Sequence, residues 1–173
     1  MPPRELERLY DEHADALFAF LLNLTRDEAD TRDALQEIFS KLATRPELIR
    51  GARDERGFLI RLAHNLAHNL AIDLMRRRSA RNRAHDGLAG EPPQLFATAA
   101  DPDEAGFRHQ LAEALGELPP DQRAVVHLKL WEGLTFEAIA EALEIPLNTA
   151  ASRYRYGLDK LRTRLRPLYD EIR

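Results

Sequence analysis

Residues Trp131–Arg162 read WEGLTFEAIAEALEIPLNTAASRYRYGLDKLR and have the hydrophobic pattern of a helix-turn-helix. Thr135 is a candidate N-cap, and the apolar residues that follow it recur at the spacing of an amphipathic helix. The dipeptide Ile145-Pro146 ends this helix, because the residue before a proline is pushed out of helical geometry. A second helix is predicted from about Asn148.

This second helix has an apolar stripe and an opposite face that is polar and cationic. Such a face fits the major groove of DNA, where arginine reads guanine and hydroxyl or amide groups reach phosphates and base edges. A solvated helical hairpin inside an all-helical domain has the same pattern, so the rest of the chain must distinguish the two. The stripe consists of Leu147, Ala150, Tyr154, Leu158, Leu161 and Leu165, and the polar face of Asn148, Thr149, Ser152, Arg153, Arg155 and Tyr156.

Composition limits the classes of protein. The 173 residues suffice for one or two small domains, and the absence of cysteine excludes disulfides and thiolate metal sites. The N-terminal residues are charged and no apolar run approaches about 20 residues, so we expect a cytoplasmic protein without membrane insertion. The net charge is −4, but residues 86–118 hold 7 acidic residues against one arginine. The cations cluster at Arg76–Arg83 and Arg153–Arg166, where nucleic acid could bind.

Few strand signals are visible, and the remaining apolar periodicity is helical. Helices are expected at Pro3–Leu24, from a capping box of Thr25 and Glu28 to about Thr44, and from near Asp54 to about Arg83. Further helices are expected at Phe107–Leu118 and after Pro119. The sequence thus predicts an all-α fold, with two small helical domains at residues 1–84 and 107–173 joined by a flexible linker at residues 85–106, which are rich in Gly, Pro, Ala and acid.

Four segments match the patterns of one bacterial family. Asp33–Phe39 matches D-x-x-Q-E-x-F, and Asn69–Arg77 matches R-N-x-A-I-D-x-x-R-R from its asparagine onward. Leu118–Val125 matches L-P-x-x-x-R-x-V, Gly133–Ala140 is similar to G-x-s-x-x-E-I-A with Ala138 at the glutamate position, and Pro146–Arg153 is similar to P-x-G-T-V-K-S-R. The chain therefore resembles an extracytoplasmic-function (ECF) sigma factor, a compact member of the sigma-70-like RNA polymerase sigma factors.

The resemblance implies an alternative sigma factor that directs core RNA polymerase to specific promoters, with an anti-sigma factor as a further partner. It implies that the first domain is region 2, which binds polymerase and the minus-10 element, and that the second is region 4, which binds the minus-35 element. Carried over to this sequence, the polymerase-binding residues are Asp33, Gln36, Glu37 and Phe39, the minus-10 residues are Asn69, Arg76, Arg77 and Arg78, and the minus-35 residues are Asn148, Thr149, Ser152, Arg153 and Arg155.

One departure from the family pattern is a tandem repeat, in which Leu62–Asn65 and Leu66–Asn69 both read LAHN. Four extra residues add about 6 Å of rise and about 40° of rotation to a helix. We expect Gly57 to yield and the insertion to displace Phe58–Leu62, which would leave Asn69 in place. His64 and His68 have the spacing of a metal pair, but the duplication explains that spacing, so no metal or cofactor is predicted.

The strongest rival is a two-domain helix-turn-helix transcriptional regulator with an N-terminal sensor or dimerisation domain. Binding to core polymerase distinguishes the two, because a regulator would bind a DNA site unaided. An enzyme is not expected, because the sequence contains no H-E-x-x-H zinc motif, phosphate-cradling glycine loop or nucleophile elbow.

Overall fold

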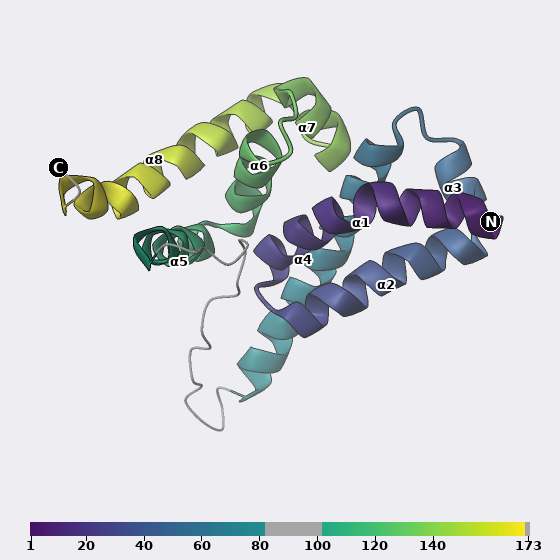
Figure 1. The fold of residues 1–173 in the computed structure, drawn as a ribbon, viewed down its shortest axis with the longest axis horizontal. Coiled ribbons are helices and arrows are strands. Elements are labelled where there is room, and N and C mark those ends of the chain that lie inside the picture. Colours follow the sequence, from purple (N-terminus) through teal and green to yellow (C-terminus); the bar gives the residue numbers. More distant parts are fainter. Residues whose placement is uncertain (82–101, 172–173) are drawn as a thin grey trace. The chain divides into compact units, whose positions relative to one another are not determined.

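The computed structural model describes the backbone of residues 1–81 and 102–171 and the side chains of residues 1–73 and 104–167. All regular elements in these ranges are helices, which agrees with the all-α prediction. The chain divides into two compact units, Met1–Glu91 and Pro92–Arg173 (Figure 1). The linker predicted at 85–106 falls mostly outside the described residues, and the domain bounds stay a prediction. The helix predicted from Phe107 already begins at Pro102, within the last residues of that linker.

The N-terminal unit is built from α1 (Pro3–Thr25), α2 (Glu28–Thr44), the short α3 (Glu47–Arg50) and α4 (Glu55–Arg81). Helices α1 and α2 lie antiparallel, and α4 packs against both of them (Figure 1). Each helix turns one apolar stripe inward, and the residues of these stripes meet in one core. The largest buried side chains of this core are Leu9, Phe20, Leu21, Ile38, Leu42 and Leu59.

The turn between α1 and α2 corrects one prediction. Asp27, not Thr25, is the N-cap of α2, and its side chain accepts a hydrogen bond of 2.9 Å from the Asp30 amide. Thr25 instead pairs its hydroxyl with that of Thr31 at 2.7 Å. The predicted capping box was therefore wrong, because Arg26 takes a left-handed conformation (φ 62°) that ends α1 and lets the chain turn before α2 begins.

The C-terminal unit contains α5 (Pro102–Glu117), α6 (Pro120–Leu130), α7 (Phe136–Leu143) and α8 (Leu147–Glu171). Helix α8 packs against the other three. Its apolar stripe meets α5 and α6 in a core that includes Leu115, Val126 and Leu161. Leu147 was predicted to belong to this stripe, but its side chain is 49% exposed because it lies in the first turn of α8, at the edge of the core.

The helix-turn-helix predicted at Trp131–Arg162 is formed by α7 and α8. Thr135 caps α7, because its hydroxyl oxygen accepts a 3.1 Å hydrogen bond from the Ala138 amide. Glu144 ends α7 in a left-handed conformation (φ 54°), and its amide donates to the carbonyls of Ala140 and Glu141. Pro146 then accepts hydrogen bonds from the first free amides of α8. This tight turn fixes the angle at which α8 leaves the motif.

Candidate functional sites

Helix α2 presents part of its predicted polymerase-binding set to solvent. Asp33, Gln36 and Glu37 are exposed on one side of the helix, and Glu37 pairs with Lys41 at 2.6 Å. Phe39 lies on the inner side and is only 8% exposed. Its ring packs on Tyr10 of α1, with 4.9 Å between the ring centroids. Phe39 therefore supports the exposed face of α2 from within the core.

Tyr10 of α1 was not among the candidate residues identified from the sequence. Its side chain is 50% exposed although its ring contacts the Phe39 ring in a tilted arrangement, with an interplanar angle of 59°. The residue type itself indicated this position, since tyrosine combines an apolar ring with a polar tip that favours a half-exposed position.

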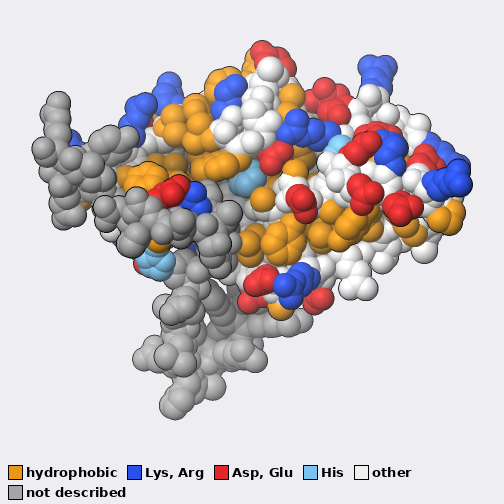
Figure 2. Space-filling model, in the orientation of Figure 1, with side chains coloured by type: hydrophobic (Ala, Val, Ile, Leu, Met, Phe, Trp, Pro, Cys, Tyr) orange, Lys and Arg blue, Asp and Glu red, His pale blue; other side chains and the backbone are white. Residues whose placement is uncertain are grey.

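Figure 2 shows acidic and basic side chains interspersed over the N-terminal unit on the face drawn.

The candidate minus-10 residues all belong to α4. Asn69 is exposed, and so is Asn65, its counterpart in the first copy of the repeat. Arg76, Arg77 and Arg78 continue the helix, but their side chains lie outside the described residues. The rings of His64 and His68 lie nearly parallel, with an interplanar angle of 18° and a centroid separation of 6.4 Å.

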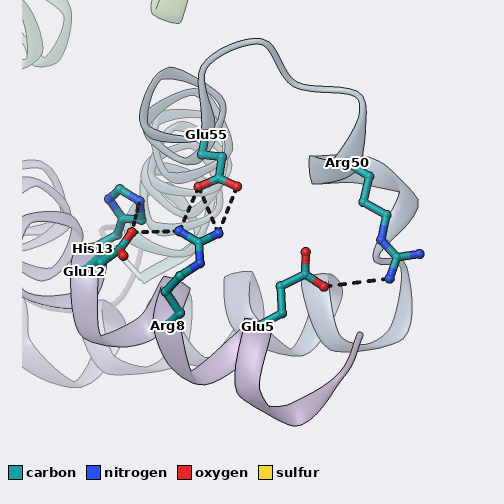
Figure 3. A network of polar contacts seen from close by, with 6 residues as sticks. All are labelled: Glu5, Arg8, Glu12, His13, Arg50 and Glu55. Atoms are coloured by element: carbon teal, nitrogen blue, oxygen red, sulfur yellow. Dashed lines mark hydrogen bonds and ion pairs between the residues drawn. The ribbon is translucent and has the colours of Figure 1, made fainter.

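The start of α4 is tied to α1 by an ion-pair network (Figure 3). The Arg8 guanidinium donates to both carboxylate oxygens of Glu55 at 3.0–3.2 Å and to Glu12 at 2.8 Å. The pKa of Arg8 lies above its ordinary value, chiefly because of the hydrogen bond to Glu55. Glu12, His13 and Glu55 bring potential metal-ligand atoms within 4.8 Å of one another. Because Arg8 already binds both carboxylates, this cluster is a structural link between helices.

The recognition helix α8 separates its polar residues into two groups. At about 100° per residue, Asn148, Ser152 and Arg155 fall within about 60° of one another, on the side opposite Gly157. Asn148 and Arg155 are exposed, and the Ser152 hydroxyl donates to the Thr149 carbonyl at 3.1 Å. The Arg155 guanidinium carbon lies 5.1 Å from the ring centroid of Tyr156, whose side chain is 53% exposed.

Arg153 belongs to the second group, which faces the rest of the unit. Its side chain is 28% exposed and forms an ion pair of 2.9 Å with Asp121 at the start of α6. Thr149 is half-buried on the same flank. The helix thus presents Arg155, and not Arg153, on its outermost face.

The packing of the C-terminal unit depends on two further residues. Arg123 is 6% exposed and donates to the carbonyls of Gly116 and Leu118 at 3.1 and 2.9 Å, so it closes the end of α5 against α6. Gly157 lies where α8 crosses α6, and a Cβ there would stand 2.6 Å from a methyl group of Val126. These two residues set the angle between α8 and the helices that support it.

Two family models match the chain in the order of its two units. The model described as "Sigma-70 region 2" matches residues 9–81, and "Sigma-70, region 4" matches residues 108–161. The ECF RNA polymerase sigma factor SigL of Mycobacterium tuberculosis is 35% identical over 167 residues, which cover 94% of this chain and 90% of SigL. The chain belongs to the ECF sigma factors. Membership in this family favours the sigma factor over the two-domain regulator.

Two more similarities extend over nearly the whole sigma factor. SigX of Bacillus subtilis, another ECF RNA polymerase sigma factor, is 26% identical over 169 residues, 95% of this chain and 85% of SigX. The sigma factor RpoE of Bartonella quintana, solved in complex with the anti-sigma factor NepR, has a TM-score of 0.74 at 18% identity and covers 94% of this chain. At that identity the structural similarity concerns the fold. In the described residues, no helix has the length and apolar character needed to span a membrane.

Proposed function

We propose that the two units of this alternative sigma factor bind different parts of the polymerase–promoter complex. The exposed side of α2, with Asp33, Gln36 and Glu37, docks on core RNA polymerase. Asn69 and the arginines Arg76, Arg77 and Arg78 hold the opened minus-10 element, because single-strand capture needs cations for the backbone and amides for extruded bases. The observation that carries this proposal is the match of both units, in order, to regions 2 and 4 of the family.

The second unit places the outer face of α8 in the major groove of the minus-35 element. Arg155 is the base reader, since it is exposed and its guanidinium is held beside Tyr156. Asn148, Thr149 and Ser152 fix the register of the helix on phosphates. Arg153 supports the helix through Asp121 and reaches DNA only after that ion pair opens.

The proposal includes the partners and the setting of the protein. An anti-sigma factor is proposed as a further partner, in line with the complex of RpoE with NepR. We also place the protein in the cytoplasm, where the polymerase acts, and assign it the role of an initiation factor and not of an enzyme. In this proposal region 2 spans residues 1–84 and region 4 spans residues 107–173.

A double substitution on α2 tests the polymerase contact. Gln36→Ala with Glu37→Ala should weaken co-purification with core polymerase while the helical content stays unchanged, because both side chains are exposed. The matched control is Glu7→Ala with Asp11→Ala, which removes two exposed side chains from α1. If the α2 variant still binds core polymerase like the control, the docking face is wrongly assigned.

A further inference from the structure

The duplicated tetrapeptide lies in the middle of α4. The helix runs without interruption from Glu55 to Arg81, so neither a bulge nor a break absorbs the four additional residues. An uninterrupted helix must shift one of its ends by about 6 Å and rotate it by about 40° relative to a chain with a single copy. The packing of α4 indicates which end moves.

The N-terminal half of α4 is fixed in the core of its unit. Leu59 and Ile60 are 0% and 4% exposed, and Ala63 is 0% exposed. The first turn is also anchored from outside, because Glu55 holds the Arg8 guanidinium of α1. Gly57 does not interrupt the helix, and the Phe58 amide already donates to the Asp54 carbonyl at 3.1 Å.

A chain with a single copy has the same sequence whichever copy is removed, so only two alignments with the core exist. If the C-terminal half kept its place in the single-copy chain, Glu55 and Arg56 would occupy the sites of Leu59 and Ile60. Two charged side chains would then be buried at apolar sites. If the N-terminal half keeps its place, Leu70 and Ala71 replace Leu66 and Ala67, so the same residue types fill the same sites. The second alignment preserves the core.

We infer that the duplication is absorbed at the promoter-facing end of α4, and that Asn65 is a further promoter-contacting residue. Measured from the buried core, Asn65 occupies the place that the family pattern gives to its asparagine, and Asn69 lies about 6 Å beyond it. Both side chains are exposed and therefore accessible to an extruded base. This inference rests on the proposed role of region 2, and it is the opposite of the expectation that Phe58–Leu62 would be displaced.

The alignment can be tested without any activity measurement, because the chain contains no cysteine and pairs of spin labels can be introduced cleanly. Labels at Glu7 and Asp15 of α1 serve as references, each paired with a label at Arg53 or at Asp73. The full chain is compared with a variant that lacks residues 66–69. Distances to Arg53 should agree in both proteins, and distances to Asp73 should differ by up to about 6 Å. Shifted distances to Arg53 with constant distances to Asp73 would overturn the inference.

The role of Asn65 is tested in the holoenzyme on a promoter template. Asn65→Ala should reduce the amount of open complex by about three- to ten-fold, the effect of one lost hydrogen bond, with polymerase binding unchanged. Asn69→Ala removes the corresponding asparagine of the second copy and should have a smaller effect. No loss at Asn65, or an equal or larger loss at Asn69, overturns the assignment. Failure of the parent to bind core polymerase would instead refute the proposed function, and the label distances would still test the alignment.

Discussion

The crossing of α8 over α6 allows a quantitative prediction for Gly157→Ala. A new Cβ would lie 2.6 Å from a Val126 methyl group, and Val126 is fully buried. Overpacking of this kind costs about 1–3 kcal/mol, whereas replacing glycine by alanine inside a helix gains about 0.5–1 kcal/mol. The overpacking term is larger, so we expect a net loss of about 1 kcal/mol in the free energy of unfolding of the C-terminal unit.

The single tryptophan, Trp131, lies in this unit, so its fluorescence during thermal unfolding of the full chain reports the effect. A loss of about 1 kcal/mol corresponds to a melting temperature about 4–8 °C lower for a domain of this size. Gly106→Ala is the matched control, because Gly106 lies within α5 and nothing stands within 4 Å of its added Cβ. Gly106→Ala should raise stability through helix propensity alone. If Gly157→Ala raised stability equally, the close approach of the two helices would be refuted.

Three further predictions concern single side chains. Arg155→Ala should weaken promoter binding by about 1–3 kcal/mol and relax the base preference. Arg153→Ala should mainly lower the stability of the C-terminal unit, by about 0.2–1 kcal/mol. Binding titrations on variant promoters distinguish the two roles, and a loss of affinity for Arg155→Ala that is uniform across promoters would mean that Arg155 contacts only phosphate. Glu144→Gly should raise the free energy of unfolding by about 0.5–1 kcal/mol, since glycine adopts φ 54° without strain, and an unchanged denaturation midpoint would argue against strain at this turn. Phe39→Ala should lower the stability of the N-terminal unit by about 3–5 kcal/mol and Gln36→Ala by less than about 0.5 kcal/mol; similar urea midpoints for both variants would contradict the burial of Phe39.

The sequence sufficed for features that depend on local chemistry. Thr135 was expected to cap α7 and does so, because a threonine before an amphipathic stretch satisfies a free amide within its own turn. The order of the longer helices followed from apolar periodicity in the same way, since each period is encoded within one segment, whereas the four-residue α3 was not predicted.

The sequence did not suffice for contacts between segments that lie apart in the chain. Arg153 was predicted to face DNA because it lies in a basic recognition helix, but its guanidinium forms an ion pair of 2.9 Å with the carboxylate of Asp121 in α6. Phe39 matched a polymerase-binding motif, but Tyr10 of α1 covers its ring. Periodicity gives the direction of a side chain around its own helix and does not identify the helix that meets it there. Such pairings depend on crossing angles, which small residues such as Gly157 set at single points.

The same reasoning explains why the effect of the repeat could not be obtained from the sequence pattern. Leu62, Leu66 and Leu70 are spaced by four, so they fit an apolar stripe whichever end of α4 moves. The energetic difference lies upstream, at Leu59 and Ile60, whose burial contributes about 1.5–3 kcal/mol each. Replacing both by Glu55 and Arg56 would forfeit about 3–6 kcal/mol before the penalty for burying charge is added, a large part of the stability of a small domain. The core therefore holds the N-terminal half of α4, and the duplication acts on the end that carries the candidate promoter contacts.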